Sequence, residues 1–165
     1  MQPYSVALAI ASCLAVAQPT LSVLPAQVVA SSVEIVAAHW LRDNVLAERS
    51  GVVFDRRTTV DLHREKRQDR DPTSSGLIAG ALGIPVATPD LRLACDSFVG
   101  CRSPRGHTSL AMSLPQVDGA EATVAVILLR RPTVAHRSEL AELYRIRLKL
   151  DGDSWVVTGA SVTVP

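Results

Sequence analysis

The sequence predicts an α+β fold in which an N-terminal amphipathic helix packs on a curved antiparallel sheet that ends in a four-strand meander. Apolar residues recur at helical spacing within residues 31–49, and apolar and basic residues alternate within residues 144–150. Asp151-Gly152 then supplies the tight turn of a hairpin. The chain has 165 residues, of which 47% are hydrophobic and 20% charged, a balance typical of one globular domain.

The N-terminal segment is expected to lie outside that domain. Residues 5–17 are apolar or small and uncharged, but they are fewer than the about 20 residues that a membrane-spanning helix needs. They fit the core of a secretory signal that is cut after Ala17. We therefore expect a signal peptide over 1–17, a tether over 18–30 and a single α+β domain over 31–165. The protein would be exported to the periplasm or the extracellular space, with no transmembrane helix in its mature form.

Two alternatives to a cleaved signal remain open. Residues 1–4 lack the basic residue usual in a signal peptide, so these residues could belong to a buried N-terminal helix. Ile10-Ala11-Ser12-Cys13 resembles the lipobox of bacterial lipoproteins, so a lipid anchor at Cys13 is the other alternative.

The remaining two cysteines, Cys95 and Cys101, lie close together in the stretch CDSFVGC. In an oxidising compartment this even number of cysteines predicts a disulfide that closes a small local loop. A zinc site is not expected, because no second pair of Cys or His residues lies at ligand spacing. No metal and no cofactor are therefore predicted.

The helix predicted over 31–49 has recognisable ends. Ser31 and Glu34 form the pattern of a capping box at its start, and Gly51 follows its end. Its apolar stripe consists of Val33, Val36, Ala37, Trp40, Leu41 and Val45. We expect Glu34 to point away from that stripe and Trp40 to be buried against the sheet, more deeply than Trp155.

The middle of the chain predicts short elements. Residues 52–54 and 58–62 have the composition of strands, and Thr73-Ser74-Ser75 can cap a short helix that reaches Leu82 and stops at Gly83. The charged run within 63–72 is expected to be solvated. Residues 84–106 are expected to be irregular and to carry the disulfide.

The last third of the chain predicts the meander. Its strands are expected near 110–114, 123–129, 144–150 and 155–164. Residues 123–129 are apolar on both faces, which favours a central strand. The helix would cover the apolar face of this sheet.

This order of elements is similar to that of the NTF2-like (cone-fold) superfamily, whose members often end in a strand, an Asp-Gly turn and a Trp-containing strand. The local likeness lies in residues 144–157, and residues 84–106 have no counterpart. The resemblance implies a conical pocket, which that superfamily uses in enzymes, in ligand carriers and in protein-binding modules alike.

Candidate chemistry is sparse, because the sequence contains no phosphate-binding loop, dinucleotide-binding motif, HExxH motif or nucleophile elbow. Asp61 and His63 could form a carboxylate-oriented base, and His39 could project into a pocket beside the helix. The structural alternatives are a polar strand end for Asp61 and His63 and a solvated boundary histidine for His39.

A second group of candidates could bind an anion. Arg102, Arg105 and His107 lie close together before a predicted strand, although a solvated loop is the simpler explanation. Nucleic acid is not an expected partner, because 17 Lys and Arg residues against 16 Asp and Glu residues leave a net charge of only +1.

The sequence thus favours an exported, non-catalytic domain that binds a small ligand or a protein. The alternatives are a pocket enzyme that uses a His or Asp base, such as a hydrolase or an isomerase, and a structural or protein-interaction component of the cell envelope. The ligand and the oligomeric state are left open.

Overall fold

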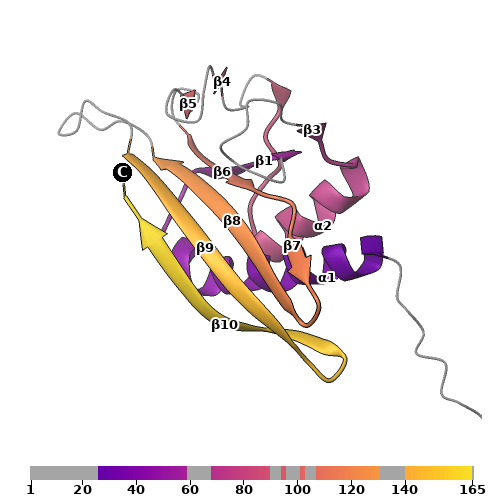
Figure 1. Ribbon diagram of the computed structural model, residues 1–165. Coiled ribbons are helices and arrows are strands. Elements are labelled where there is room, and N and C mark those ends of the chain that lie inside the picture. Colours follow the sequence, from indigo (N-terminus) through magenta and orange to yellow (C-terminus); the bar gives the residue numbers. More distant parts are fainter. Residues whose placement is uncertain are drawn as a thin grey trace, which may run out of the picture.

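The computed structural model describes residues 26–58, 68–89, 94–95, 101–102, 107–130 and 140–164. Two helices lie against one face of a long, curved sheet (Figure 1). The helices are α1 (Ala26–Leu41), which continues into a π-helical turn η1 (Arg42–Leu46), and α2 (Pro72–Leu82). The main sheet contains β1 (Val52–Asp55), β6 (Thr108–Met112), β7 (Gln116–Asp118), β8 (Glu121–Arg130), β9 (Leu140–Asp151) and β10 (Ser154–Thr163).

The main sheet has the order β1-β6-β8-β9-β10, and β7 pairs with part of β8. All of these pairings are antiparallel except that of β1 with β6. Strands β6, β8, β9 and β10 are the predicted four-strand meander, and α1 contacts β8, β9 and β10 as expected. The α+β fold is therefore confirmed. Two small ladders lie outside this sheet: β2 (Arg57–Thr58) with β3 (Gln68–Asp69), and β4 (Ala94–Cys95) with β5 (Cys101–Arg102).

The start of α1 differs from the prediction. The helix already runs at Ala26, so Ser31 lies inside it and not at its N-terminus, and residues 26–30 of the predicted tether are helical. Glu34 is buried, not solvated, because its carboxylate forms an ion pair with Arg70. Arg70 itself comes from the charged run predicted to be solvated. It is buried because its Nη2 also donates to the carbonyl oxygens of Met112 and Ser113 at 2.9 and 3.0 Å.

The second helix has the predicted span but a different cap. Asp71 is its N-cap, and the carboxylate of Asp71 accepts a hydrogen bond from the Ser74 backbone N–H at 2.9 Å. Pro72 occupies the first turn, where a missing N–H costs nothing. Gly83 ends the helix with φ +70°, a conformation that glycine adopts without steric cost.

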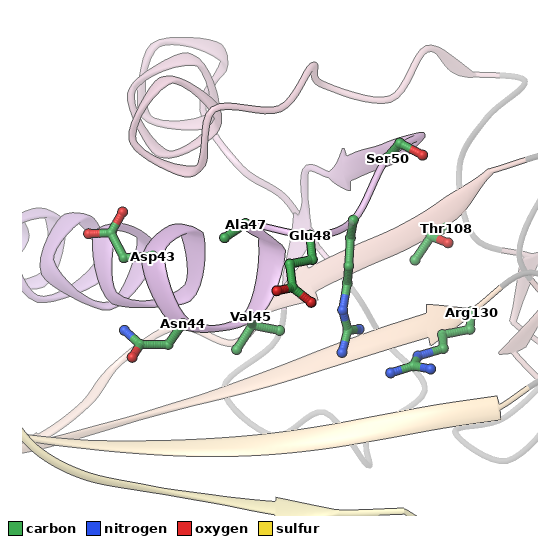
Figure 2. A pocket seen from close by; sticks show the side chains of 9 residues that line it. Asp43, Asn44, Val45, Ala47, Glu48, Ser50, Thr108 and Arg130 are labelled. Carbon is green, nitrogen blue, oxygen red and sulfur yellow. The ribbon is translucent and has the colours of Figure 1, made fainter.

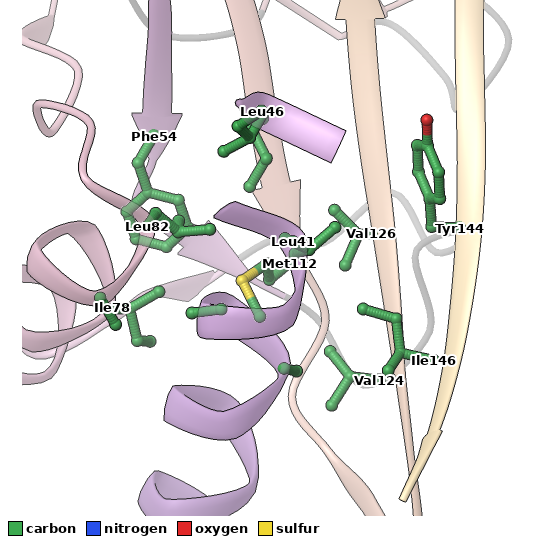
Figure 3. Close-up of a cluster of buried hydrophobic side chains, with 14 of the residues drawn as sticks. Leu41, Leu46, Phe54, Ile78, Leu82, Met112, Val124, Val126, Tyr144 and Ile146 are labelled. Atoms are coloured by element: carbon green, nitrogen blue, oxygen red, sulfur yellow. The ribbon is translucent and has the colours of Figure 1, made fainter. Parts of the chain in front are cut away.

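The core lies between the helices and the inner face of the sheet (Figure 3). Leu41 and Leu46 approach Phe54 from one side, while Val126 and Ile146 line the sheet. The two tryptophans reverse their expected order. Trp155 is 8% exposed, whereas Trp40 is only partly buried at the margin of the core. Trp155 belongs to the buried core, whereas Trp40 only packs against it from the edge.

Strand β8 is central, as its apolar sequence predicts. Its inner face joins the main core, and on its outer face Ile127 and Leu129 form a small second cluster with Ala111. Burial on both faces explains why this segment lacks alternation. The strand predicted over 52–54 is confirmed as β1. Of the strand predicted over 58–62, only Thr58 lies within the described residues, where it belongs to β2.

Candidate functional site

A pocket of about 690 Å³ opens at one end of the sheet, beyond the last turn of the N-terminal helix. Asp43, Asn44 and Val45 approach it from η1, and Thr108 and Arg130 lie at the ends of β6 and β8 (Figure 2). The remaining lining residues follow η1 along the chain and are Ala47, Glu48, Arg49 and Ser50. The pocket therefore lies between the end of the predicted helix and the sheet, and its lining is mainly polar.

Local backbone geometry positions these groups. Leu46 is buried and fixes the end of η1, so the residues after it must leave the core. Gly51, with φ +69°, then turns the chain into β1, and its carbonyl oxygen accepts a hydrogen bond from the Thr108 backbone N–H at 3.0 Å. This bond ties the segment that carries Arg49 to the first residue of β6.

The two arginines of the pocket are joined by the carboxylate of Glu142, which lies on the inner face of β9 and is not itself a lining residue. Its Oε2 accepts hydrogen bonds from Arg49 Nη2 at 3.0 Å and from the Tyr144 hydroxyl at 2.5 Å. Its Oε1 forms an ion pair with Arg130 Nη2. Through these three donors, the carboxylate of Glu142 joins β9 to β8 and to the segment that follows η1.

The protonation states follow from these contacts. Burial by itself would raise the pKa of Glu142. The hydrogen bonds from Tyr144 and Arg49 and the charges of Arg49 and Arg130 outweigh burial, so the pKa of Glu142 lies below its ordinary value. Burial, together with the hydrogen bond to Glu142, raises the pKa of the Tyr144 hydroxyl. At neutral pH the cluster therefore holds an ionised carboxylate and a protonated phenol.

The cluster carries more positive than negative charge. Two guanidinium groups share the single carboxylate of Glu142, which leaves one positive charge in excess. Among the described residues, the buried Nη1 of Arg49 has no hydrogen-bond partner. Of the acidic residues that line the pocket, Asp43 is neutralised by Arg42 at 2.7 Å, whereas Glu48 lies exposed at the rim. Such an arrangement can receive an anion on its arginine side.

Of the candidate residues that the structure describes with their side chains, neither His39 nor His107 lines this pocket. His39 is exposed on α1, and His107 is half-buried immediately before β6. Arg102 is described only by its backbone in β5. Asp61, His63 and Arg105 lie outside the described residues, as do Cys13, the predicted signal peptide and residues 18–25 of the predicted tether. The roles suggested for these residues stay hypotheses.

Sequence reasoning missed Arg49, Arg130, Glu142 and Tyr144. A partial signal for two of them was available. Glu142 and Tyr144 continue the alternation of β9 toward its beginning, so Glu142 falls on the inner face together with Ile146. A carboxylate on the inner face of a strand needs partners. Of those partners, Arg130 lies on the neighbouring strand β8, whereas Arg49 is 93 positions away in the sequence.

The part of the chain that the structure describes contains no group of three or more His, Cys, Asp or Glu residues placed to hold a metal ion. Over the same residues, no helix combines the length and the apolar character needed to cross a membrane. Comparisons of the chain with models of protein families, with curated proteins and with solved structures find no match.

Proposed function

We propose that the protein is an exported binding domain that holds a small anionic ligand in the pocket at Arg49 and Arg130. The observation that carries this proposal is the excess positive charge of the Glu142 cluster, together with the buried, unpartnered Nη1 of Arg49 among the described residues. A carboxylate or phosphate group of the ligand would accept hydrogen bonds from the guanidinium groups of Arg49 and Arg130, both of which line the pocket.

The chemistry of Glu142 favours binding over catalysis. A general base works best with a pKa near the operating pH, whereas the pKa of Glu142 is lowered. Its oxygens are also occupied by Arg49, Arg130 and Tyr144. In this proposal Glu142 is a positioning residue that holds the two guanidinium groups apart and directs them toward the pocket.

Two further observations fit an exported domain of the NTF2-like kind. The resemblance implies a conical pocket, and a pocket opens between η1 and the ends of β6 and β8. Cys95 and Cys101 are direct Cα partners in the β4–β5 ladder. Direct antiparallel partners lie about 4.5–5.5 Å apart, which is within the Cα separation that a disulfide spans. We include this disulfide, and export directed by residues 5–17, in the proposal.

The proposal is tested by calorimetric titration with two probes, inorganic phosphate and acetate, followed by larger mono- and dicarboxylates. The wild-type chain is compared with Arg49→Met and with a matched control, Arg56→Met. Arg56 also forms an ion pair, with Asp69 at 2.7 Å, but does not line the pocket. We expect Arg49→Met to weaken anion binding at least tenfold, about 1.4 kcal/mol, and Arg56→Met to leave it unchanged.

The two probes distinguish the chemistry of the ligand. Stronger binding of phosphate than of acetate, lost in Arg49→Met, points to a phosphorylated ligand, and the reverse order points to a carboxylate. Equal weakening by Arg49→Met and Arg56→Met would mean that the anions respond only to overall charge, and it would overturn the proposal.

A further inference from the structure

Strand β10 forms one edge of the main sheet, next to β9 (Figure 1). It is ten residues long, and in the described part of the chain its ladder is formed with β9 alone. From Ser154 to Val164 it contains no charged residue, and Val156 and Val162 are 47% and 55% exposed. Exposed edge strands normally carry charges or prolines that prevent pairing with another chain. Apart from one bulge near Gly159, β10 lacks such protection.

The outer face beside this edge is basic. Arg145, Arg147 and Lys149 alternate along β9 and are exposed. Lys149 lies opposite Glu121 of β8, whereas Arg145 and Arg147 lie opposite uncharged residues on both neighbouring strands. The two arginines therefore have no carboxylate in the cross-strand positions of the sheet.

Arg147 reaches from β9 across the edge strand. A Cβ placed on Gly159 of β10 would lie 3.2 Å from Arg147 Nη2 and 3.8 Å from its Cζ, so the guanidinium group lies directly over this glycine. Arg145 lies opposite another small residue, Ser161. Small side chains on β10 thus allow long basic side chains to extend toward the position that an added strand would occupy, about 4.8 Å beyond β10.

We propose that β10 receives an extended segment of an acidic partner protein by strand addition, with alternate carboxylates of that segment on Arg147 and Arg145. The backbone edge of β10 would supply the pairing, and the two arginines would select the charge. This interface lies on the outer face of the sheet and is independent of the pocket at Arg49.

A second copy of this chain fits the edge less well. Its own β10 has no Asp or Glu between Ser154 and Val164, so it brings no carboxylate to Arg147. The two-fold pairing of two such edges would also place the basic side chains of both copies along one face. Charge complementarity therefore favours an acidic partner over self-association.

The test uses a fluorescent twelve-residue peptide of alternating Val and Glu, with control peptides that carry Gln or Lys in place of Glu. Fluorescence anisotropy measures binding to the wild-type chain, to Arg147→Glu and to Arg42→Glu, a matched charge reversal on η1. Arg147→Gln, which keeps a long polar side chain, guards against misfolding of the reversed variant. Circular dichroism checks the fold of each variant.

We expect the Glu peptide to bind the wild-type chain at least tenfold more tightly than the Gln peptide. Arg147→Glu should reverse the preference in favour of the Lys peptide, Arg147→Gln should abolish the preference, and Arg42→Glu should change nothing. Hydrogen exchange of the amides of β10 should slow when the Glu peptide is bound. Equal binding of all three peptides would overturn the proposal. So would a concentration-dependent dimer that protects the β10 amides without any peptide.

Discussion

Glu34 and Glu142 are both buried glutamates held by arginine, at opposite ends of β6. Glu34 on α1 meets Arg70, whose Nη2 donates to the carbonyl oxygens of Met112 and Ser113 at the end of that strand. Glu142 on β9 meets Arg49 and Arg130 beside Thr108, at the start of it. The side chains of Glu34 and Arg70 are 5% and 3% exposed, whereas those of Arg49 and Arg130 are 24% and 46% exposed.

This contrast separates a structural pair from a binding cluster. The Glu34–Arg70 pair is balanced in charge and closed to solvent, and its hydrogen bonds connect α1 with the sheet. The Glu142 cluster has two cations for one anion and opens into a pocket. A buried charge must be compensated within the protein, but a charge at a pocket can be compensated by a ligand.

The strongest test of the contrast is removal of Arg70. Arg70→Met leaves the carboxylate of Glu34 buried without its partner, so we expect the free energy of unfolding in urea to fall by about 3–5 kcal/mol. The double variant Glu34→Leu with Arg70→Met should recover much of that loss, because it removes both charges. A nearly neutral Arg70→Met would show that this pair does not hold α1 to the sheet.

Removal of Arg49 should affect anion binding strongly and folding stability only slightly. Arg130 and Tyr144 still hold Glu142 in Arg49→Met, and the lost ion pair is partly exposed, so we expect stability to fall by only about 1 kcal/mol. Anion binding, in contrast, should weaken at least tenfold. A destabilisation as large as that of Arg70→Met, with anion binding retained, would assign both clusters the same structural role.

The two glutamates should also respond differently to acid. The pKa of Glu142 is lowered, so its contribution to stability is complete above about pH 4.3 and is lost as the pH falls through its lowered pKa. Burial raises the pKa of Glu34, because it outweighs the opposing effect of the Arg70 charge. The contribution of Glu34 to folding stability therefore declines as the pH rises through that raised pKa. Urea unfolding between pH 2.5 and 7 should show less acid destabilisation in Glu142→Gln than in the wild type. In Glu34→Gln, the decline of stability at the higher pH values should be absent. Identical dependence of stability on pH in the wild type and both variants would contradict both assignments.

The smallest expected effect concerns the rim of the pocket. Glu48 is exposed there, and its negative charge opposes an anion near Arg49. We expect Glu48→Gln to tighten phosphate binding about twofold, an effect that added salt reduces. Weaker binding in this variant would instead indicate that Glu48 contacts a positive group of the ligand.

The elements that the sequence predicted are those that depend on local signals. Gly83 ends α2, Asp151-Gly152 forms the final hairpin, and the apolar run of β8 marks a central strand. The features that the sequence predicted wrongly or did not reveal depend on contacts between residues that are distant in the sequence. Glu34 looked like a capping residue because its partner Arg70 is 36 positions away, and Glu142 is 93 positions from Arg49. Periodicity places a residue on a face of an element, but it does not reveal which charge on another element will meet it.

The most direct test of the central contrast is ¹⁵N NMR of the arginine side-chain Nε–H groups during titration with phosphate and with acetate. The signals of Arg49 and Arg130 should shift with a common saturation curve, while that of Arg70 stays fixed, because its carboxylate and carbonyl partners lie within the protein. A titration in which Arg70 shifts as much as Arg49, or in which neither Arg49 nor Arg130 responds, would contradict the account.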